Sequence, residues 1–490
     1  MAFTRGTIFK SFLWKLFERL SAQLIQFVVT IVLARLLLPS EYGTIALIAI
    51  FIQLCDVIID GGLNTALIQK KEADNTDFST IFYFSLGMAT VLYGLMFVSS
   101  PLIAAFYDQP ELISVIRVLS LSLPLYAFNS IQRAYVSKMM LFQRLFYSSI
   151  GAVIISGGVG IYMAYQGYGV WALVAQQLSN VFFTTVIMWF TVRWRPVIRF
   201  SVERFKSLFS YGWKIFGANI ITTLFVNARK LVIGKFYAPA SLAFYEKGDQ
   251  LPSLVMSNIF SSVQAILLPT FSDSQDDRPR VKAMMRRSTK LSCFFIYPLM
   301  VGMIVAAKPL VVFLLTEKWL PAVEFVQILC IANFFRPITL SNWEAIKALG
   351  YSGITLKLEI VKKVADITIL VVSAMIGVYA IAWGCVLFNF ICVFINLAPN
   401  KKLLNYGIRE QVIDAVPTLL IALTMGIAVY WIQWLNLPNL VILILQFVLG
   451  AGIYISLCWI FKEENFLYVT NILKENRYRL RNLRKGNSLE

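Results

Sequence analysis

Long apolar stretches follow one another along almost the whole chain, separated by short polar segments. A helix needs about 20 mainly apolar residues to cross a membrane, and fourteen stretches are long enough. They are Phe12–Leu38, Tyr42–Ile68, Phe78–Phe106, Leu112–Val136, Leu145–Gln166, Gly169–Val192, Leu208–Phe236, Leu242–Thr270, Ser288–Leu315, Ala322–Leu349, Ile354–Ile376, Val378–Ala398, Val412–Trp434 and Asn439–Phe461. The pattern predicts an all-α integral membrane protein with about 14 transmembrane helices.

The composition supports this class and excludes several kinds of chemistry. Of the 490 residues, 58% are hydrophobic and 14% are charged, whereas a soluble domain has about 25% charged residues. The chain contains no histidine, which excludes Ser-His-Asp triads and histidine-based zinc sites. Its six cysteines form no Cys-x-x-Cys pair and read as buried core residues. We therefore predict no catalytic group, no metal and no cofactor.

Lysine and arginine fall mainly in alternate loops, which indicates the orientation of the helices. One set of loops holds Lys70 and Lys71, then Lys138 and Arg144, five basic residues from Arg193 to Lys206, and six from Arg278 to Lys290. The intervening loops hold only Lys235, Lys308 and Lys318. We expect both termini in the cytoplasm. The net charge of +18 then follows from the basic residues of the cytoplasmic loops and tail. We therefore expect no nucleic-acid partner.

Similar sequences recur at a spacing of about 200 residues, which predicts an internal repeat. Residues 34–40 resemble 234–240, and residues 169–174 resemble 377–382. We therefore expect two parallel six-helix lobes and two appended helices. The predicted regions are an N-lobe at 1–200, a C-lobe at 201–411, the appended helices at 412–461 and a basic amphipathic cytoplasmic tail at 462–490. The tail suits anionic membrane lipids, and a disordered tail without a specific role is an equal alternative.

Several ionisable residues lie at membrane depth, where a charge is costly and usually faces a cavity or a partner. The candidate substrate-binding cations are Arg19, Arg35, Arg117, Arg133, Arg229, Lys230, Lys247 and Arg336. The candidate carboxylates for ion coupling or ion pairing are Asp56, Asp60, Glu246 and Asp249. A cavity rich in cations suits phosphate. Internal ion pairing is the structural alternative, and near helix ends, as at Arg35, side chains can extend to the lipid headgroups.

Several longer motifs carry a resemblance to a known family. They are Leu33-Ala-Arg-Leu-Leu-Leu-Pro-Ser-Glu-Tyr-Gly, Asp60-Gly-Gly-Leu-Asn-Thr-Ala-Leu-Ile-Gln, Gly167-Tyr-Gly-Val-Trp-Ala-Leu-Val, Leu242-Ala-Phe-Tyr-Glu-Lys-Gly-Asp-Gln-Leu-Pro and Leu315-Thr-Glu-Lys-Trp-Leu-Pro. As a set they resemble the polysaccharide-transporter family, the Wzx-type flippases of the multidrug/oligosaccharidyl-lipid/polysaccharide exporter superfamily. The resemblance is strongest to the branch of colanic-acid and teichuronic-acid exporters.

The resemblance implies a flippase that moves undecaprenyl-pyrophosphate-linked oligosaccharide repeat units across the bacterial cytoplasmic membrane by alternating access. It implies a cation-lined cavity bounded by helices one, two, seven and eight. H+ or Na+ is the implied coupling ion, and membrane lipids and polysaccharide polymerase machinery are implied partners. The chain departs from the family at Tyr245-Glu246-Lys247, where relatives often have Tyr-Asn-Arg.

Three other classes compete with this interpretation. A multidrug exporter of the same superfamily would share the fold, but its substrates favour an acidic pocket. A membrane glycosyltransferase or polymerase usually needs a large outward loop, and the outward loops here are short. A scaffold or lipid scramblase would leave the charges at membrane depth unexplained.

Overall fold

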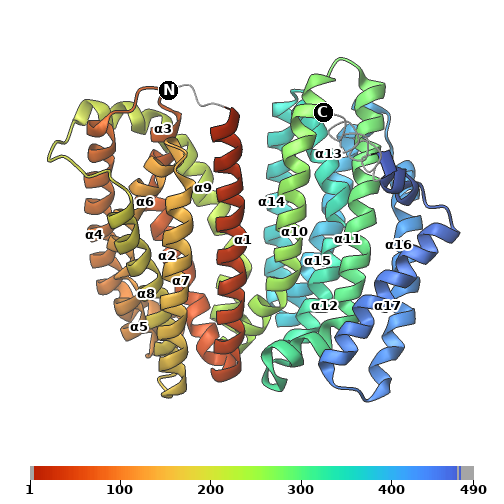
Figure 1. Ribbon diagram of the computed structural model, residues 1–490, viewed down its shortest axis with the longest axis horizontal. Helices are drawn as coiled ribbons and strands as arrows, with labels where there is room; N and C mark the ends of the chain where they lie inside the picture. Colours follow the sequence, from red (N-terminus) through yellow and green to blue (C-terminus); the bar gives the residue numbers. More distant parts are fainter. Residues whose placement is uncertain (1–4, 472–473, 476–490) are drawn as a thin grey trace, which may run out of the picture. The chain divides into compact units, whose positions relative to one another are not determined.

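The computed structural model describes residues 5–471 and 474–475 of the 490. Every regular element in that part of the chain is a helix, so the predicted all-α class is confirmed (Figure 1). Contacts divide the chain into two compact units, unit 1 at Met1–Ala243 and unit 2 at Phe244–Glu490. This division differs from the predicted lobe boundary at 200/201, which rests on the sequence repeat and remains a prediction.

Unit 1 contains α1 (Arg5–Leu36), α2 (Pro39–Asp60), α3 (Leu63–Gln69), α4 (Asn75–Phe106), α5 (Leu112–Leu119), α6 (Ser122–Lys138), α7 (Phe142–Tyr165), α8 (Val170–Thr191) and α9 (Val202–Phe236). Helix α7 packs against α8 and α1, and glycines permit close approach. A Cβ atom on Gly157 would lie 2.5 Å from Val29 Cγ2, and one on Gly160 would lie 2.7 Å from Gln176 Cβ. Small residues at helix contacts are the usual way in which membrane helices pack.

Unit 2 contains most of α10 (Pro239–Asp273), which begins in unit 1, and then α11 (Arg278–Leu315), the short η1 (Glu317–Trp319), α12 (Ala322–Asn333), α13 (Arg336–Ala348), α14 (Ser352–Ala374), α15 (Val378–Leu404), α16 (Ile408–Tyr430), η2 (Trp431–Leu435) and α17 (Asn439–Ile460). Helix α11 packs against α12, α13, α16 and α17 and forms the centre of the unit. All six cysteines are buried, as expected from their apolar surroundings, and they form no disulfide bond within the described residues.

The fourth and tenth predicted spans, one in each unit, are broken at the same place relative to a proline. In unit 1, α5 ends and α6 begins around Ser120, four residues before Pro124. In unit 2, α12 ends at Asn333, four residues before Pro337. A proline has no N–H to donate to the carbonyl four residues earlier, which explains both interruptions.

The structure corrects one predicted span. The apolar stretch Tyr42–Ile68 is not one helix, because α2 ends at Asp60 and α3 starts at Leu63. Gly61 and Gly62 between them have φ angles of +52° and +69°, which are left-handed conformations that glycine adopts readily. The apolar residues continue through this turn and conceal the end of the helix.

Twelve helical segments of the described chain are long and apolar enough to cross a membrane. The remaining two predicted spans correspond to α9 and α14, which are 35 and 23 residues long but carry several charges. The count of fourteen is therefore approximate. Of the predicted tail, residues 464–471 and 474–475 are helical, and its basic residues from Arg477 onward lie outside the described chain.

Candidate functional site

In unit 1, charged and polar side chains from α2 and α6 lie near one another. Asp56 is half-buried, and Arg133 lies close enough to it for an electrostatic interaction. Tyr126, two turns before Arg133 on α6, is within electrostatic range of Asp56, Asp60 and Arg133. The structure thus brings three predicted site residues, Asp56, Asp60 and Arg133, into one group.

The two aspartates of this group differ in their hydrogen bonding. Asp60 accepts a hydrogen bond from the Asn64 side chain on α3. In the described residues, Asp56 Oδ1 is buried and accepts no hydrogen bond. A buried carboxylate oxygen without a donor is energetically costly. Asp56 therefore differs from Asp60 in having a buried carboxylate oxygen without a hydrogen-bond donor.

In unit 2, a second carboxylate and arginine lie near each other, on α10 and α13. Asp249 accepts a hydrogen bond of 2.9 Å from Ser253 Oγ and acts electrostatically on Arg336. Arg336 donates to Asn333 Oδ1 at 3.3 Å, and its guanidinium lies 5.0 Å from the centre of the Phe260 ring. Arg336 is exposed and opens α13, where the helix dipole adds positive potential. Each unit therefore contains an aspartate–arginine pair, on the second and fourth predicted spans in unit 1 and on the eighth and tenth in unit 2.

The other predicted site residues lie outside these two pairs. Arg19 on α1 is exposed. Arg117 packs on α4, donating to Ser100 Oγ at 3.0 Å with its guanidinium 4.3 Å from the Phe97 ring centre, so it serves an internal contact. Lys247 donates to Gln250 Oε1 at 3.3 Å. Each of the remaining four also has interactions, namely Arg35, Arg229, Lys230 and Glu246.

Four buried acidic residues were missing from the sequence-based set. They are Asp77, Glu344, Asp366 and Asp414, with 0%, 1%, 8% and 5% of their surface exposed. Asp77 immediately precedes a predicted span, where an acidic residue is ordinary. The motif Asp74-Asn-Thr-Asp77 does indicate the start of a helix, because an acidic residue three positions after an N-cap is typical of such a start. The structure contains this reciprocal capping of α4.

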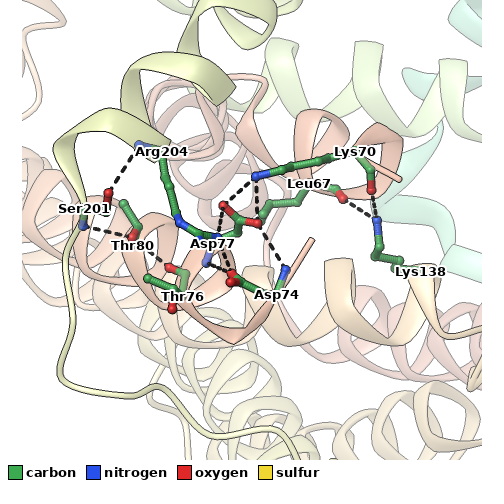
Figure 2. Close-up of polar contacts among 9 residues, drawn as sticks. All are labelled: Leu67, Lys70, Asp74, Thr76, Asp77, Thr80, Lys138, Ser201 and Arg204. Carbon is green, nitrogen blue, oxygen red and sulfur yellow. Dashed lines mark hydrogen bonds and ion pairs between the residues drawn. The ribbon is translucent and has the colours of Figure 1, made fainter. Parts of the chain in front are cut away.

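Asp77 is the centre of a polar cluster that Figure 2 shows at the start of α4. Lys70 Nζ lies 2.8 Å from each of its carboxylate oxygens, and Arg204 NH1 lies 3.2 Å from Oδ1. Arg204 also lies 2.6 Å from Asp74. Partial burial raises the pKa of Asp74, but hydrogen bonds from the Asp77 backbone and from Arg204 outweigh it and hold the pKa below its usual value. The cluster fixes α9 and the segment before it to α4.

The family model described as "Polysaccharide biosynthesis protein" matches residues 32–324, which is more than half of the chain. The chain belongs to this family. The resemblance inferred from the sequence motifs is thereby confirmed. The succinoglycan biosynthesis transport protein ExoT of Rhizobium meliloti is a relative, 22% identical over 387 residues that cover 78% of this chain and 77% of ExoT.

Two solved structures have a similar fold. The lipid II flippase MurJ in an inward closed conformation matches with a TM-score of 0.74 and 14% identity, over 92% of this chain and 99% of MurJ. An inward-facing multidrug resistance MATE family transporter matches with a TM-score of 0.60 and 14% identity, over 78% of this chain and 94% of that protein. The protein is therefore a multi-pass membrane protein of a polysaccharide biosynthesis family. The fold alone does not separate lipid flippases from drug exporters.

Proposed function

We propose that the protein moves a lipid-linked oligosaccharide, carried on undecaprenyl pyrophosphate, across the bacterial cytoplasmic membrane by alternating access. The observation that carries this proposal is the family match over residues 32–324. A transport protein of succinoglycan biosynthesis among its relatives supports the substrate class. The predicted lobes at 1–200 and 201–411 would be the two moving bodies, and both termini would lie in the cytoplasm.

The charges of the aspartate–arginine pairs suit such a substrate. A pyrophosphate carries several negative charges, and its transfer through hydrocarbon without partners would be prohibitive. Arginine forms two parallel hydrogen bonds with phosphate oxygens. Arg133 and Arg336 both lie exposed in their units, and an acidic residue acts on each of them. Asp56, Asp60, Glu246 and Asp249 are the proposed sites for H+ or Na+ coupling, since the chain has no histidine.

The test is transport by the purified full-length protein in proteoliposomes. A fluorescent lipid-linked oligosaccharide is added to one leaflet, and its arrival in the other is followed with a membrane-impermeant quencher. Charge-assisted hydrogen bonds contribute about 1.5–3 kcal/mol, so Arg133→Gln and Arg336→Gln should each slow transport about tenfold or more. Arg193→Gln is the matched control, because Arg193 is an exposed loop residue.

Two results would each overturn one part of the proposal. One is transport of a cationic drug but not of the lipid-linked oligosaccharide, which would place the protein with the multidrug exporters. The other is an unchanged rate in both arginine variants at equal protein levels. The second result would refute the role of these arginines while leaving the substrate class intact.

A further inference from the structure

In each unit, one helix comes after six predicted spans, and ion pairs near its beginning connect it to the third of those spans. We call each such set of ion pairs a tie. In unit 1, α9 follows six spans and is tied to α4, the third. In the second half, α16 follows the next six spans and packs against α11, which is the third of them. In their order along the chain, α9 and α16 therefore have the same relation to the spans that precede them.

The tie in unit 1 has its acidic residues on the third span. Asp77 and Asp74 at the start of α4 bind Arg204 in the first turn of α9 at 3.2 and 2.6 Å. The segment before α9 adds neutral contacts, with the Ser201 N–H donating to Thr80 Oγ1 and the Val197 N–H to Ser79 Oγ. Figure 2 shows Arg204 and Asp77 pointing toward each other.

The tie in unit 2 has the opposite polarity, with basic residues on the third span. Arg286 of α11 binds Asp414 of α16 through two parallel hydrogen bonds of 2.7 Å. One turn earlier on both helices, Lys282 lies 2.9 Å from Glu410. Lys290, one turn after Arg286, lies 3.4 Å from Asp414.

Each tie is built on one buried carboxylate. The side chains of Asp77 and Asp414 are 0% and 2% exposed, and each binds two cations, which are Lys70 and Arg204 for Asp77 and Arg286 and Lys290 for Asp414. Removing one member of a buried ion pair leaves an uncompensated charge, so such pairs discriminate strongly between correct and incorrect partners. Because both carboxylates are buried, a residue of like charge placed opposite either of them would be strongly unfavourable.

We propose that the reversed polarity assigns each of these two helices to its own unit. If α9 docked on α11, Arg204 would meet Arg286, and if α16 docked on α4, Asp414 would meet Asp77. Both exchanged pairings bring like charges together, whereas both native pairings bring opposite charges together. Helices α4 and α11 each offer a charged docking surface near their beginning, and the reversed signs make only one of them correct for each helix.

The test reverses one pair in the full-length protein and measures two quantities. The variants are R286D, D414R and the double variant R286D/D414R, with R280D as the control at an exposed arginine on the same helix. The first quantity is stability of the purified protein in detergent. Each single reversal should destabilise unit 2, R280D should not, and the double variant should recover most of the loss. The expected coupling is about tenfold in the unfolding equilibrium, as for charges in direct contact.

The second quantity is the extent to which α9 docks on α11 instead of α4. It is measured by cross-linking two cysteines, introduced at Glu203 of α9 and at Ala283 of α11. In R286D/D414R, α11 presents an acidic residue to Arg204, so cross-linking should rise severalfold above that in the chain with the cysteines alone. In R280D it should not rise. Absence of coupling between positions 286 and 414 would overturn the proposal. A stable double variant without increased cross-linking would also overturn it, because the pair would then stabilise without assigning the helices.

Discussion

Replacement of the buried carboxylate Asp77 by asparagine should destabilise unit 1 far more than the same change at its neighbour Asp74. Asp77 is fully buried and receives Lys70 at 2.8 Å on both oxygens. Loss of one member of a buried pair costs about 3–5 kcal/mol. Lys70 keeps 32% of its side chain exposed, so water can solvate it after the change. We therefore expect the lower end, about 3 kcal/mol, or roughly 100-fold in the unfolding equilibrium.

Asp74→Asn is the matched control. The Asp74 side chain is 49% exposed, and exposed ion pairs contribute about 0–1 kcal/mol. Asparagine is also as good an N-cap as aspartate, so α4 keeps its cap. Unfolding in mixed detergent micelles can be followed by tryptophan fluorescence, because Trp194 is buried beside the cluster and donates to Asn75 Oδ1 at 2.5 Å. Equal losses in the two variants, or a loss below about 1 kcal/mol for Asp77→Asn, would refute this reasoning.

Two further predictions concern packing and pH. Gly43→Ala should destabilise the protein by about 1–3 kcal/mol, because its Cβ atom would lie 1.8 Å from the Pro239 carbonyl oxygen. Gly87→Ala, whose Cβ meets nothing within 4 Å, should not lower the melting temperature, and equal effects of the two would contradict the packing argument. Glu464 binds Lys290 at 2.5 Å, and this hydrogen bond holds the pKa of Glu464 below its usual value. The stability it contributes should be fully present above its ordinary pKa of about 4.3 and be lost as the pH falls through the lowered value. Wild type should therefore melt above Glu464→Gln at neutral pH, and the difference should vanish in acid. A difference that is independent of pH would exclude this ion pair as its source.

The fold class and most spans could be predicted because hydropathy reports membrane helices directly. The sequence also indicated α9 and α14 as spans, even though their charges lower their hydropathy. The end of α2 could not be predicted in the same way. The apolar pattern runs unbroken to Ile68, and only the backbone conformation of Gly61 and Gly62 ends the helix.

The sequence predicted which types of residue form the candidate site. It did not predict which of these residues lie next to one another. Asp56 and Arg336 stood out because they interrupt apolar stretches. Their neighbours Arg133 and Asp249 come from other helices, and no local pattern connects them. Arg117 carried the same signal as Arg133 but packs on Ser100, since the direction of a side chain depends on helix rotation. The sequence did not indicate Asp77 and Asp414, because an acidic residue near a loop is usually exposed. Both of these residues are buried.

The two proline breaks have a mechanical consequence. A continuous helix resists bending because each bend stretches hydrogen bonds on its convex side. At Ser120 and Asn333 the proline four residues later cannot donate to the backbone carbonyl, so the fourth and tenth predicted spans each have a point of low stiffness. Both spans thus carry a flexible joint beside a proline, while ion pairs hold the beginning of α9 to α4 and that of α16 to α11.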